Sequence, residues 1–326
     1  MKRFCIAFLF WAWMVGGTSA QTMPFRRDTS FTTYSAYMGA LKNYPFIHIA
    51  APPVPSNIIS KNNLTYCTIN GRDLHLDIFY PAKIKANLPG VLIIHGGGWK
   101  SGDRSQHIPL AQQLAAKGYV TVTAEYRLSP EALYPAGVND LKTALKWMRA
   151  NAKMYHIDAG KIAVWGFSAG GQLAALIGTT GGDKFFTGDG WYDNYTDKVQ
   201  AIVDADGILA FIHPESGEGD DSKSKSSATL WFGASKTGRP DLWNQASALN
   251  HVSKNTPPIL FINSAVDRMH AGRTDMIKKL DSLHIYSEIH AFENTPHPFL
   301  LFDPWFEPVL NYTTAFLDKV FKRNEN

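Results

Sequence analysis

Cysteine is scarce in this sequence of 326 residues, which contains only Cys5 and Cys67. Cys5 lies in an amino-terminal segment that we expect to be removed, and a single remaining cysteine cannot form an internal disulfide. This excludes a disulfide-stabilised scaffold, so the mature protein must rely on its core, which a chain of about 300 residues can supply. Cys67 stands in a strand-like run and is predicted to be a buried small hydrophobe rather than a reactive thiol.

The chain also lacks an apolar run long enough to cross a bilayer. The unbroken run at residues 4–15 is too short, and it lies between two basic residues and the small residues Thr18-Ser19-Ala20. This arrangement predicts a secretory signal peptide over residues 1–20, cut before Gln21, with a retained anchor as the alternative. We therefore expect an exported protein, periplasmic or extracellular, without stable membrane insertion after cleavage.

Neither sign of charge is in large excess. The 32 basic and 28 acidic side chains give a net charge of +4, and the loss of Lys2 and Arg3 with the signal peptide lowers it to +2. Such a mild balance argues against nucleic-acid binding. The acidic residues Asp183, Asp189, Asp193 and Asp197 match no calcium-loop spacing, so we interpret them as solvated carboxylates and expect no metal or other cofactor.

Residues 21–60 show little periodicity and contain Pro45, Pro52, Pro53 and Pro55, which predicts an extended segment wrapped over a larger body. Two strand candidates follow, residues 64–69 and 74–80, and the Asn70-Gly71 pair between them is a strong hairpin signal. Apolar residues alternate in the second strand, which predicts a hairpin at a sheet edge with one face in water.

From residue 90 onward, strand-like runs alternate with helical patterns. The strands are expected at 90–94, 119–123, 162–165, 201–203, 259–262 and 286–292, and the helices at 108–117, 138–150, 274–283 and 309–321. This alternation predicts one α/β domain over residues 61–326, with a mostly parallel central sheet and helices on both faces. Residues 179–198 and 207–256 are predicted to be loop insertions over the carboxyl edge of the sheet.

Gly166-Phe167-Ser168-Ala169-Gly170 lies between a strand-like run and a run of good helix formers. A strand that feeds directly into a helix leaves room only for a sharp turn, and flanking glycines let neighbouring backbone approach its apex. This is the nucleophile-elbow pattern, which presents a serine hydroxyl above the sheet. We predict that Ser168 is a nucleophile; a glycine-rich turn without chemistry is the alternative.

A serine hydroxyl needs a histidine to take its proton and a carboxylate to orient that histidine. In this architecture the three follow in the order serine, acid, histidine. Asp267 lies shortly after the strand at 259–262 and is the predicted acid, with Glu293 as a weaker rival. His297 lies in the loop after the last strand and is the predicted base.

His95-Gly96-Gly97-Gly98-Trp99 follows the strand at 90–94. Three glycines let the chain fold back, so that bare backbone N–H groups can stabilise an oxyanion. A phosphate-binding loop is the alternative, but no Gly-Lys-Ser/Thr follows. His95 itself is interpreted as a structural hydrogen-bonding group rather than a base.

Together, these motifs resemble the α/β-hydrolase serine esterases, and the similarity covers residues 65–322. Within that group the chain is most similar to secreted bacterial carbohydrate esterases of the acetyl xylan, feruloyl and pectin esterase kinds. The resemblance implies Ser168, Asp267 and His297 as the triad, and the N–H groups of Gly97, Gly98 and Ala169 as the oxyanion hole. Pro298 stands where relatives usually have glycine, which predicts a stiffer histidine loop.

Aromatic residues accumulate beside polar ones in the predicted loops, which suits the C–H faces and hydroxyl edges of sugar rings. They are Trp191, Tyr192, Tyr195, Trp231, Phe232, Trp243, Trp305 and Phe306. Arg268, His270 and Arg273 cluster near the predicted acid, where cations suit a uronate polymer, although a structural ion pair explains them equally well. With Trp99, these three are the tentative substrate contacts.

We therefore expect an esterase that removes methyl or acetyl groups from plant cell-wall polysaccharide or its oligosaccharides, with pectin as the preferred substrate. Acetyl xylan or feruloyl esterase and a general short-chain esterase are the alternatives. A serine peptidase of similar fold and a non-catalytic binding protein on a hydrolase scaffold are less favoured.

Overall fold

The computed structural model describes residues 28–188 and 190–322. The expected signal peptide and its cleavage site lie outside these residues. Within them, no helix combines the length and the apolar character that crossing a membrane requires.

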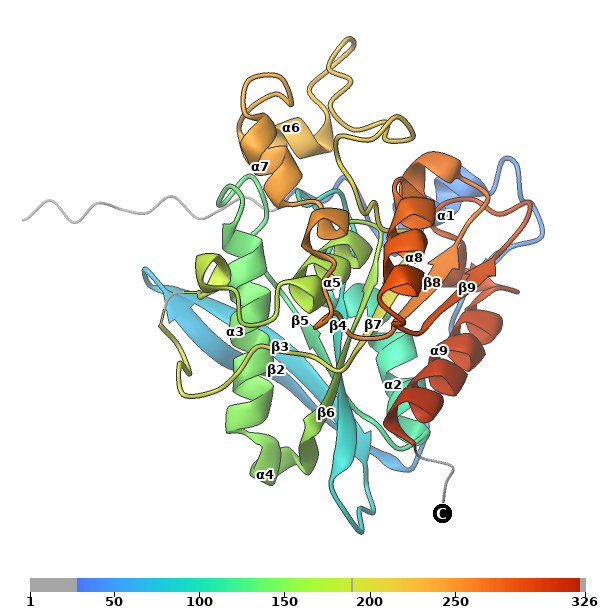
Figure 1. The fold of residues 1–326 in the computed structure, drawn as a ribbon. Coiled ribbons are helices and arrows are strands. Elements are labelled where there is room, and N and C mark those ends of the chain that lie inside the picture. Colours follow the sequence, from blue (N-terminus) through green and yellow to red (C-terminus); the bar gives the residue numbers. More distant parts are fainter. Residues whose placement is uncertain (1–27, 189, 323–326) are drawn as a thin grey trace, which may run out of the picture.

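A single eight-stranded sheet forms the centre of the described structure, with the strand order β2-β3-β5-β4-β6-β7-β8-β9 (Figure 1). In this order the strands from β5 to β9 run parallel to one another, whereas the pairs β2–β3 and β3–β5 are antiparallel. Their bounds are β2 (Ile58–Ile69), β3 (Arg72–Pro81), β4 (Leu88–Ile94), β5 (Val120–Ala124), β6 (Ile157–Phe167), β7 (Ala201–Ala205), β8 (Ile259–Asn263) and β9 (Ser287–Ala291). A two-residue ladder, β1 (His48–Ile49) with β10 (Phe302–Asp303), lies apart from this sheet.

Helices cover both faces of the sheet. Because side chains along a strand point alternately to the two faces, they contribute to two separate hydrophobic cores. On β4, Leu92 and Ile94 pack in one core, while Val91 and Ile93 pack in the other. The first core contains residues of α3 (Ala136–Ala150), α5 (Ala169–Thr179) and α8 (Arg273–Ser282), and the second contains residues of α2 (Ile108–Ala116) and α9 (Phe306–Phe321). Because both faces are covered, β5, β7 and β8 are buried along their whole length and consist mostly of apolar residues.

The loop insertion at residues 207–256 is only partly irregular. It carries two short helices, α6 (Ser227–Phe232) and α7 (Pro240–Gln245), which lie at the top of Figure 1, beyond the ends of the strands. A further short helix, α4 (Ala152–Tyr155), connects α3 to β6. The fold class predicted from the sequence is thereby confirmed, including the insertion above the sheet.

Two local predictions need correction. Residues 21–60 are not all extended, because α1 (Thr33–Ala40) forms behind an N-cap in which Thr32 and Ser35 accept each other's backbone N–H groups. The hairpin has its turn at Asn70 and Gly71, both with positive φ, but the predicted wet face of β3 is exposed only at its start, at Asp73. Asp77 and Phe79 are buried like their apolar neighbours, because α2 and the segment before it cover that side.

Candidate active site

Ser168 stands at the junction of β6 and α5, with φ 58° and ψ −122°. Its two glycine neighbours are required by close backbone contacts. A Cβ on Gly166 would lie 1.9 Å from the carbonyl oxygen of Gly170, and one on Gly170 would lie 2.2 Å from that of Ile94. The elbow predicted from the sequence is therefore present, with a strained turn that only this glycine pattern accommodates.

His297 lies in the loop after β9 and connects the serine to a carboxylate. Its Nε2 is 2.8 Å from Ser168 Oγ, and its Nδ1 is 2.8 Å from Asp206 Oδ2. The ring packs on Phe167, with centroids 4.9 Å apart. Pro298 precedes the 3-10 turn Phe299–Leu301, and His297 makes both contacts directly before it. With the proton on Nδ1, the histidine donates to Asp206 and can accept the serine proton at Nε2.

The acid in this arrangement is Asp206, and the prediction of Asp267 was wrong. The Asp206 side chain is fully buried, and its Oδ1 accepts the backbone N–H of Ser264 at 2.8 Å. The Asp267 side chain is 99% exposed, in a 3-10 turn past β8, and its nearest ionic neighbour is His270 at 3.9 Å. The rival Glu293 is exposed as well.

The physical reason is the order of strands in the sheet. Because β7 lies between β6 and β8, a residue directly after β7 is next to the elbow. Asp206 is that residue, and its φ of 55° turns the chain sharply at the strand end. The carboxylate after β8 is one strand further away, and the intervening turn carries it into solvent. The order serine, acid, histidine along the chain is kept.

Gly97, Gly98 and Ala169 line the same pocket as Ser168 and His297, a cavity of about 310 Å³. Gly97 and Gly98 have φ of 126° and 59°, and a Cβ on Gly97 would lie 2.2 Å from the carbonyl oxygen of Ser101. The loop therefore folds back on itself, as predicted, and brings bare backbone to the serine. Ala169 is the first residue of α5, where N–H groups have no partner in a preceding turn.

Comparison with known proteins identifies the family. The sequence profile of the BD-FAE family matches residues 76–273, more than half of the chain. The chain belongs to the BD-FAE family. Carboxylesterase NlhH of Mycobacterium tuberculosis is 35% identical over 155 residues, which cover 43% of this chain and 49% of that protein. Arylacetamide deacetylase of Bos taurus is 34% identical over 147 residues, 43% of this chain and 35% of that protein.

The chain thus spans about half the length of the first of these curated relatives, and less of the second. Among solved structures, a truncated carbohydrate esterase from gut microbiota has a TM-score of 0.67 at 23% identity and covers 79% of this chain and 96% of that one. A bifunctional GH43-CE protein of Bacteroides eggerthii has a TM-score of 0.68 at 23% identity, with 80% and 38% covered. These likenesses establish the α/β-hydrolase fold.

The glycine-rich loop of this BD-FAE chain is held firmly at its start. His95 is buried and stacks on Tyr126 at 4.5 Å, and the Tyr126 hydroxyl donates to the His95 carbonyl at 3.1 Å. The Gly96 N–H donates to Gln106 Oε1 at 2.8 Å. His95 is therefore a structural group, as interpreted from the sequence, and Gln106 is a support that the motif did not reveal.

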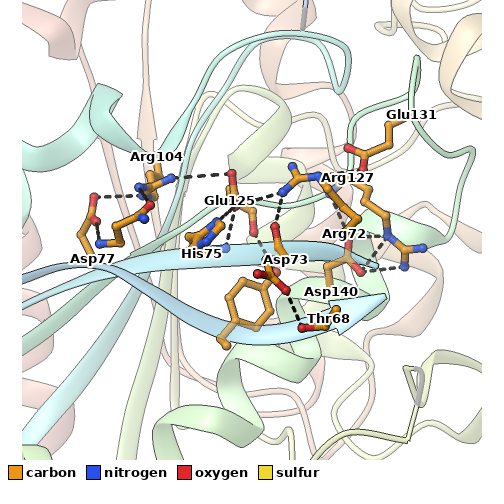
Figure 2. A network of polar contacts seen from close by, with 12 residues as sticks. Thr68, Arg72, Asp73, His75, Asp77, Arg104, Glu125, Arg127, Glu131 and Asp140 are labelled. Atoms are coloured by element: carbon orange, nitrogen blue, oxygen red, sulfur yellow. Dashed lines mark hydrogen bonds and ion pairs between the residues drawn. The ribbon is translucent and has the colours of Figure 1, made fainter. Parts of the chain in front are cut away.

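The far side of the loop is held by a charged network at the hairpin edge (Figure 2). Arg104 donates to Asp77 at 3.0 Å and lies 3.6 Å from Glu125, which also accepts from His75 Nδ1 at 2.8 Å. Burial opposes ionisation of Glu125, but its hydrogen bonds with His75 and the charge of Arg72 keep the pKa of this carboxyl below its ordinary value. Contacts to residues of neighbouring elements thus hold the loop on both sides.

Of the four tentative substrate contacts, Trp99 and Arg268 line the pocket and the other two do not. Trp99 is almost fully buried, stacks on Trp231 at 5.0 Å and donates its indole N–H to Gln172, so it forms a wall. Arg273 donates to Asn263 Oδ1 at 2.8 Å.

The remaining candidate, His270, is buried at the end of the 3-10 turn, where burial and the charge of Arg273 lower its pKa. The clustering of three cations in sequence was therefore misleading. Arg268 and His270 belong to the 3-10 turn, Arg273 begins α8, and only Arg268 lines the pocket. Of the loop aromatics, Trp231, Phe232 and Trp243 pack together in the core rather than facing a ligand.

Besides Asp206, two further charged pocket residues were not predicted as site residues from the sequence, Lys100 and Glu218. Lys100 directly follows the glycine-rich loop, and that position alone was a usable signal. Glu218 comes from the irregular part of the insertion, where no pattern indicates which side chain turns inward.

Proposed function

We propose that this protein is a serine carboxylesterase that removes small ester groups from carbohydrate. The observation that supports it most directly is the Ser168–His297–Asp206 relay, with two 2.8 Å contacts, beside the Gly97–Gly98 backbone in one pocket. These are the parts that acyl transfer from an ester requires: a nucleophile, an oriented base and donors for the oxyanion.

In this mechanism, Ser168 Oγ attacks the ester carbonyl carbon while His297 Nε2 takes its proton. Asp206 stabilises the resulting imidazolium through Nδ1–H. The N–H groups of Gly97, Gly98 and Ala169 receive the oxyanion. The carbon–oxygen bond to the alcohol then breaks, and His297 returns the proton to the leaving oxygen. Water repeats the sequence on the acyl-enzyme and releases the carboxylic acid together with free Ser168.

The pocket supports a small group on one side of the ester bond, either acetyl as the acyl group or methyl as the alcohol part. Its volume of about 310 Å³ is at the low end for ligand sites, and the buried Trp99 closes one wall. An acetyl group, or the methyl ester of a sugar acid, suits this space better than a fatty acyl chain. The solved neighbours that are described as carbohydrate esterases support the carbohydrate class.

Within that class, pectin remains our preferred substrate polymer, although fewer of the cations predicted from the sequence support it. Lys100 and Arg268 line the pocket and can meet a uronate carboxylate, whereas His270 and Arg273 cannot. A general short-chain esterase is the second candidate, favoured by curated relatives named as carboxylesterases. We also propose that the protein is exported, because a polymer substrate is met outside the cell and residues 1–20 read as a signal peptide.

The deciding experiment measures acetate, methanol and ferulate released from pectin and from acetylated or feruloylated xylan, with Ser168→Ala as the blank. Methanol or acetate from pectin at the highest rate supports the full proposal. Faster acetate release from xylan overturns the assignment of pectin as the preferred substrate but supports the assignment as a carbohydrate esterase. Activity on 4-nitrophenyl acetate alone supports a general short-chain esterase instead. If the wild type is no more active than Ser168→Ala on any ester, the proposed esterase function is overturned.

A further inference from the structure

The insertion after β7 places one carboxylate, Glu218, in the pocket that contains Ser168 and His297. Its Oε2 accepts the backbone N–H of Ala228 at 3.3 Å, which fixes the orientation of the carboxyl group. Among the described residues, Oε1 has no hydrogen-bond partner. The side chain is only partly accessible, so this oxygen offers a localised acceptor at the pocket wall.

Arg268 approaches the same wall from the turn after β8. A Cβ on Gly217 would lie 3.2 Å from Arg268 Cδ, so the arginine stem packs against the residue that precedes Glu218. Burial raises the pKa of the Glu218 carboxyl, and the nearby Arg268 charge partly offsets that rise. In the described structure, neither an ion pair within 4.0 Å nor a hydrogen bond joins the two side chains, so the donors of Arg268 and Oε1 of Glu218 are available together.

An acceptor and a donor in this arrangement match the hydroxyl groups of a sugar. Each hydroxyl carries one O–H to donate and two lone pairs to accept, so neighbouring hydroxyls can bind both side chains at once. Hydrogen bonds to charged groups are about twice as strong as neutral ones, and they discriminate against ligands that leave the buried group unpaired. A simple alkyl or nitrophenyl ester offers no such partner.

We propose that Glu218 and Arg268 form a subsite for hydroxyl groups of the sugar that carries the ester. This inference rests on the proposed function and deepens it, because it makes the enzyme select the sugar and not only the small group that is removed. A uronate carboxylate would be repelled by Glu218, so in a pectin-type substrate the acid group lies on the Lys100 side of the pocket.

The substitution Glu218→Gln tests the subsite with little change in shape. The Ala228 N–H selects the amide oxygen, so the amide NH₂ takes the place of Oε1 and a donor replaces the acceptor. The matched control is Asp220→Asn, two residues along the same segment, whose Oδ1 accepts the Ser222 N–H and which does not line the pocket. Thermal unfolding of both variants checks that the fold is kept.

Three acetate esters serve as substrates: a monoacetylated methyl glycoside with free neighbouring hydroxyls, the same glycoside with those hydroxyls O-methylated, and 4-nitrophenyl acetate. We expect Glu218→Gln to lower kcat/KM on the first by roughly 10- to 100-fold, and on the other two by less than about twofold. Asp220→Asn should match the wild type on all three. Equal losses of Glu218→Gln on all three esters would show a structural role and overturn the subsite.

A binding experiment tests the subsite independently of the proposed esterase function. The free methyl glycoside is titrated into Ser168→Ala, with and without Glu218→Gln, by NMR. Weaker binding with Glu218→Gln supports the subsite even if the wild type hydrolyses none of the esters, a result that would overturn the esterase alone. Unchanged binding together with unchanged kcat/KM on the free-hydroxyl ester overturns the subsite and leaves the esterase intact.

Discussion

Asp206→Asn is the sharpest test of the triad, because the structure dictates how the amide must orient. The Ser264 N–H donates to Asp206 Oδ1 at 2.8 Å, so the asparagine oxygen takes that position. The amide NH₂ then faces His297 Nδ1, where the carboxylate oxygen lay at 2.8 Å. A donor at this point holds Nδ1 unprotonated and places the ring proton on Nε2, which can no longer accept the proton of Ser168.

The expected loss follows from this tautomer. A serine triad whose aspartate is replaced by asparagine loses about 10⁴-fold in kcat, which corresponds to about 5.5 kcal/mol of transition-state stabilisation. Asp267→Asn should change kcat by less than twofold, since its side chain is almost fully exposed and does not line the pocket. Glu293→Gln should be equally neutral.

The assay compares kcat on 4-nitrophenyl acetate for the three variants, after thermal unfolding has shown that each is folded. Near-normal turnover of Asp206→Asn, together with a large loss in Asp267→Asn, would refute the assignment and restore the acid that follows β8. A large loss in both variants would show that the two loops rearrange around His297, and the static geometry would no longer explain the chemistry.

Three further outcomes follow from charges in the described structure. Burial lowers the pKa of His107 to about 3, so only the unfolded chain takes up a proton at this residue between about pH 6.5 and 3. The free energy of unfolding therefore falls by about 1.4 kcal/mol per pH unit as pH decreases through this range. His107→Leu should remove that contribution in urea titrations from pH 6 to 4, and an unchanged pH dependence would contradict this expectation. Burial holds the pKa of Asp204 well above its ordinary value, so the folded state keeps a proton that the unfolded chain releases, and stability falls as pH rises above about 4. Asp204→Asn should therefore raise Tm more at pH 8 than at pH 5, and an equal shift at both would count against a neutral carboxyl. Lys100→Ala should raise KM on pectin about 2- to 10-fold more than on 4-nitrophenyl acetate, and added salt should abolish the difference. Equal effects on both esters would contradict a contact between Lys100 and the uronate carboxylate.

The core of the fold was readable from sequence because its strands are apolar on both faces. Runs such as residues 91–94 are buried against helices on both sides, so burial and composition agree without knowledge of the partners. Helix α1 lacked such a signal. Its only buried residue is Ala40, while Tyr34 and Met38 are largely exposed, so no apolar stripe marks it and only its N-cap at Thr32 does. The wet face predicted for β3 failed because burial there depends on α2, which comes later in the chain.

In the site as well, residues fixed by local contacts were predictable, whereas the residue fixed by long-range contacts was not. Ser168 and the glycines beside it are fixed by contacts within one turn, and His297 is reached from the end of the last strand, so both were predictable. The acid was not, because Asp206 and Asp267 both follow a strand and both satisfy the order serine, acid, histidine. What separates them is that β7 lies beside β6 whereas β8 lies one strand further, and that spatial order is not written in the chain order. Asp206 is closer because the sheet places its strand there, and the N–H of Ser264, arriving from β8, then fixes its carboxylate toward His297.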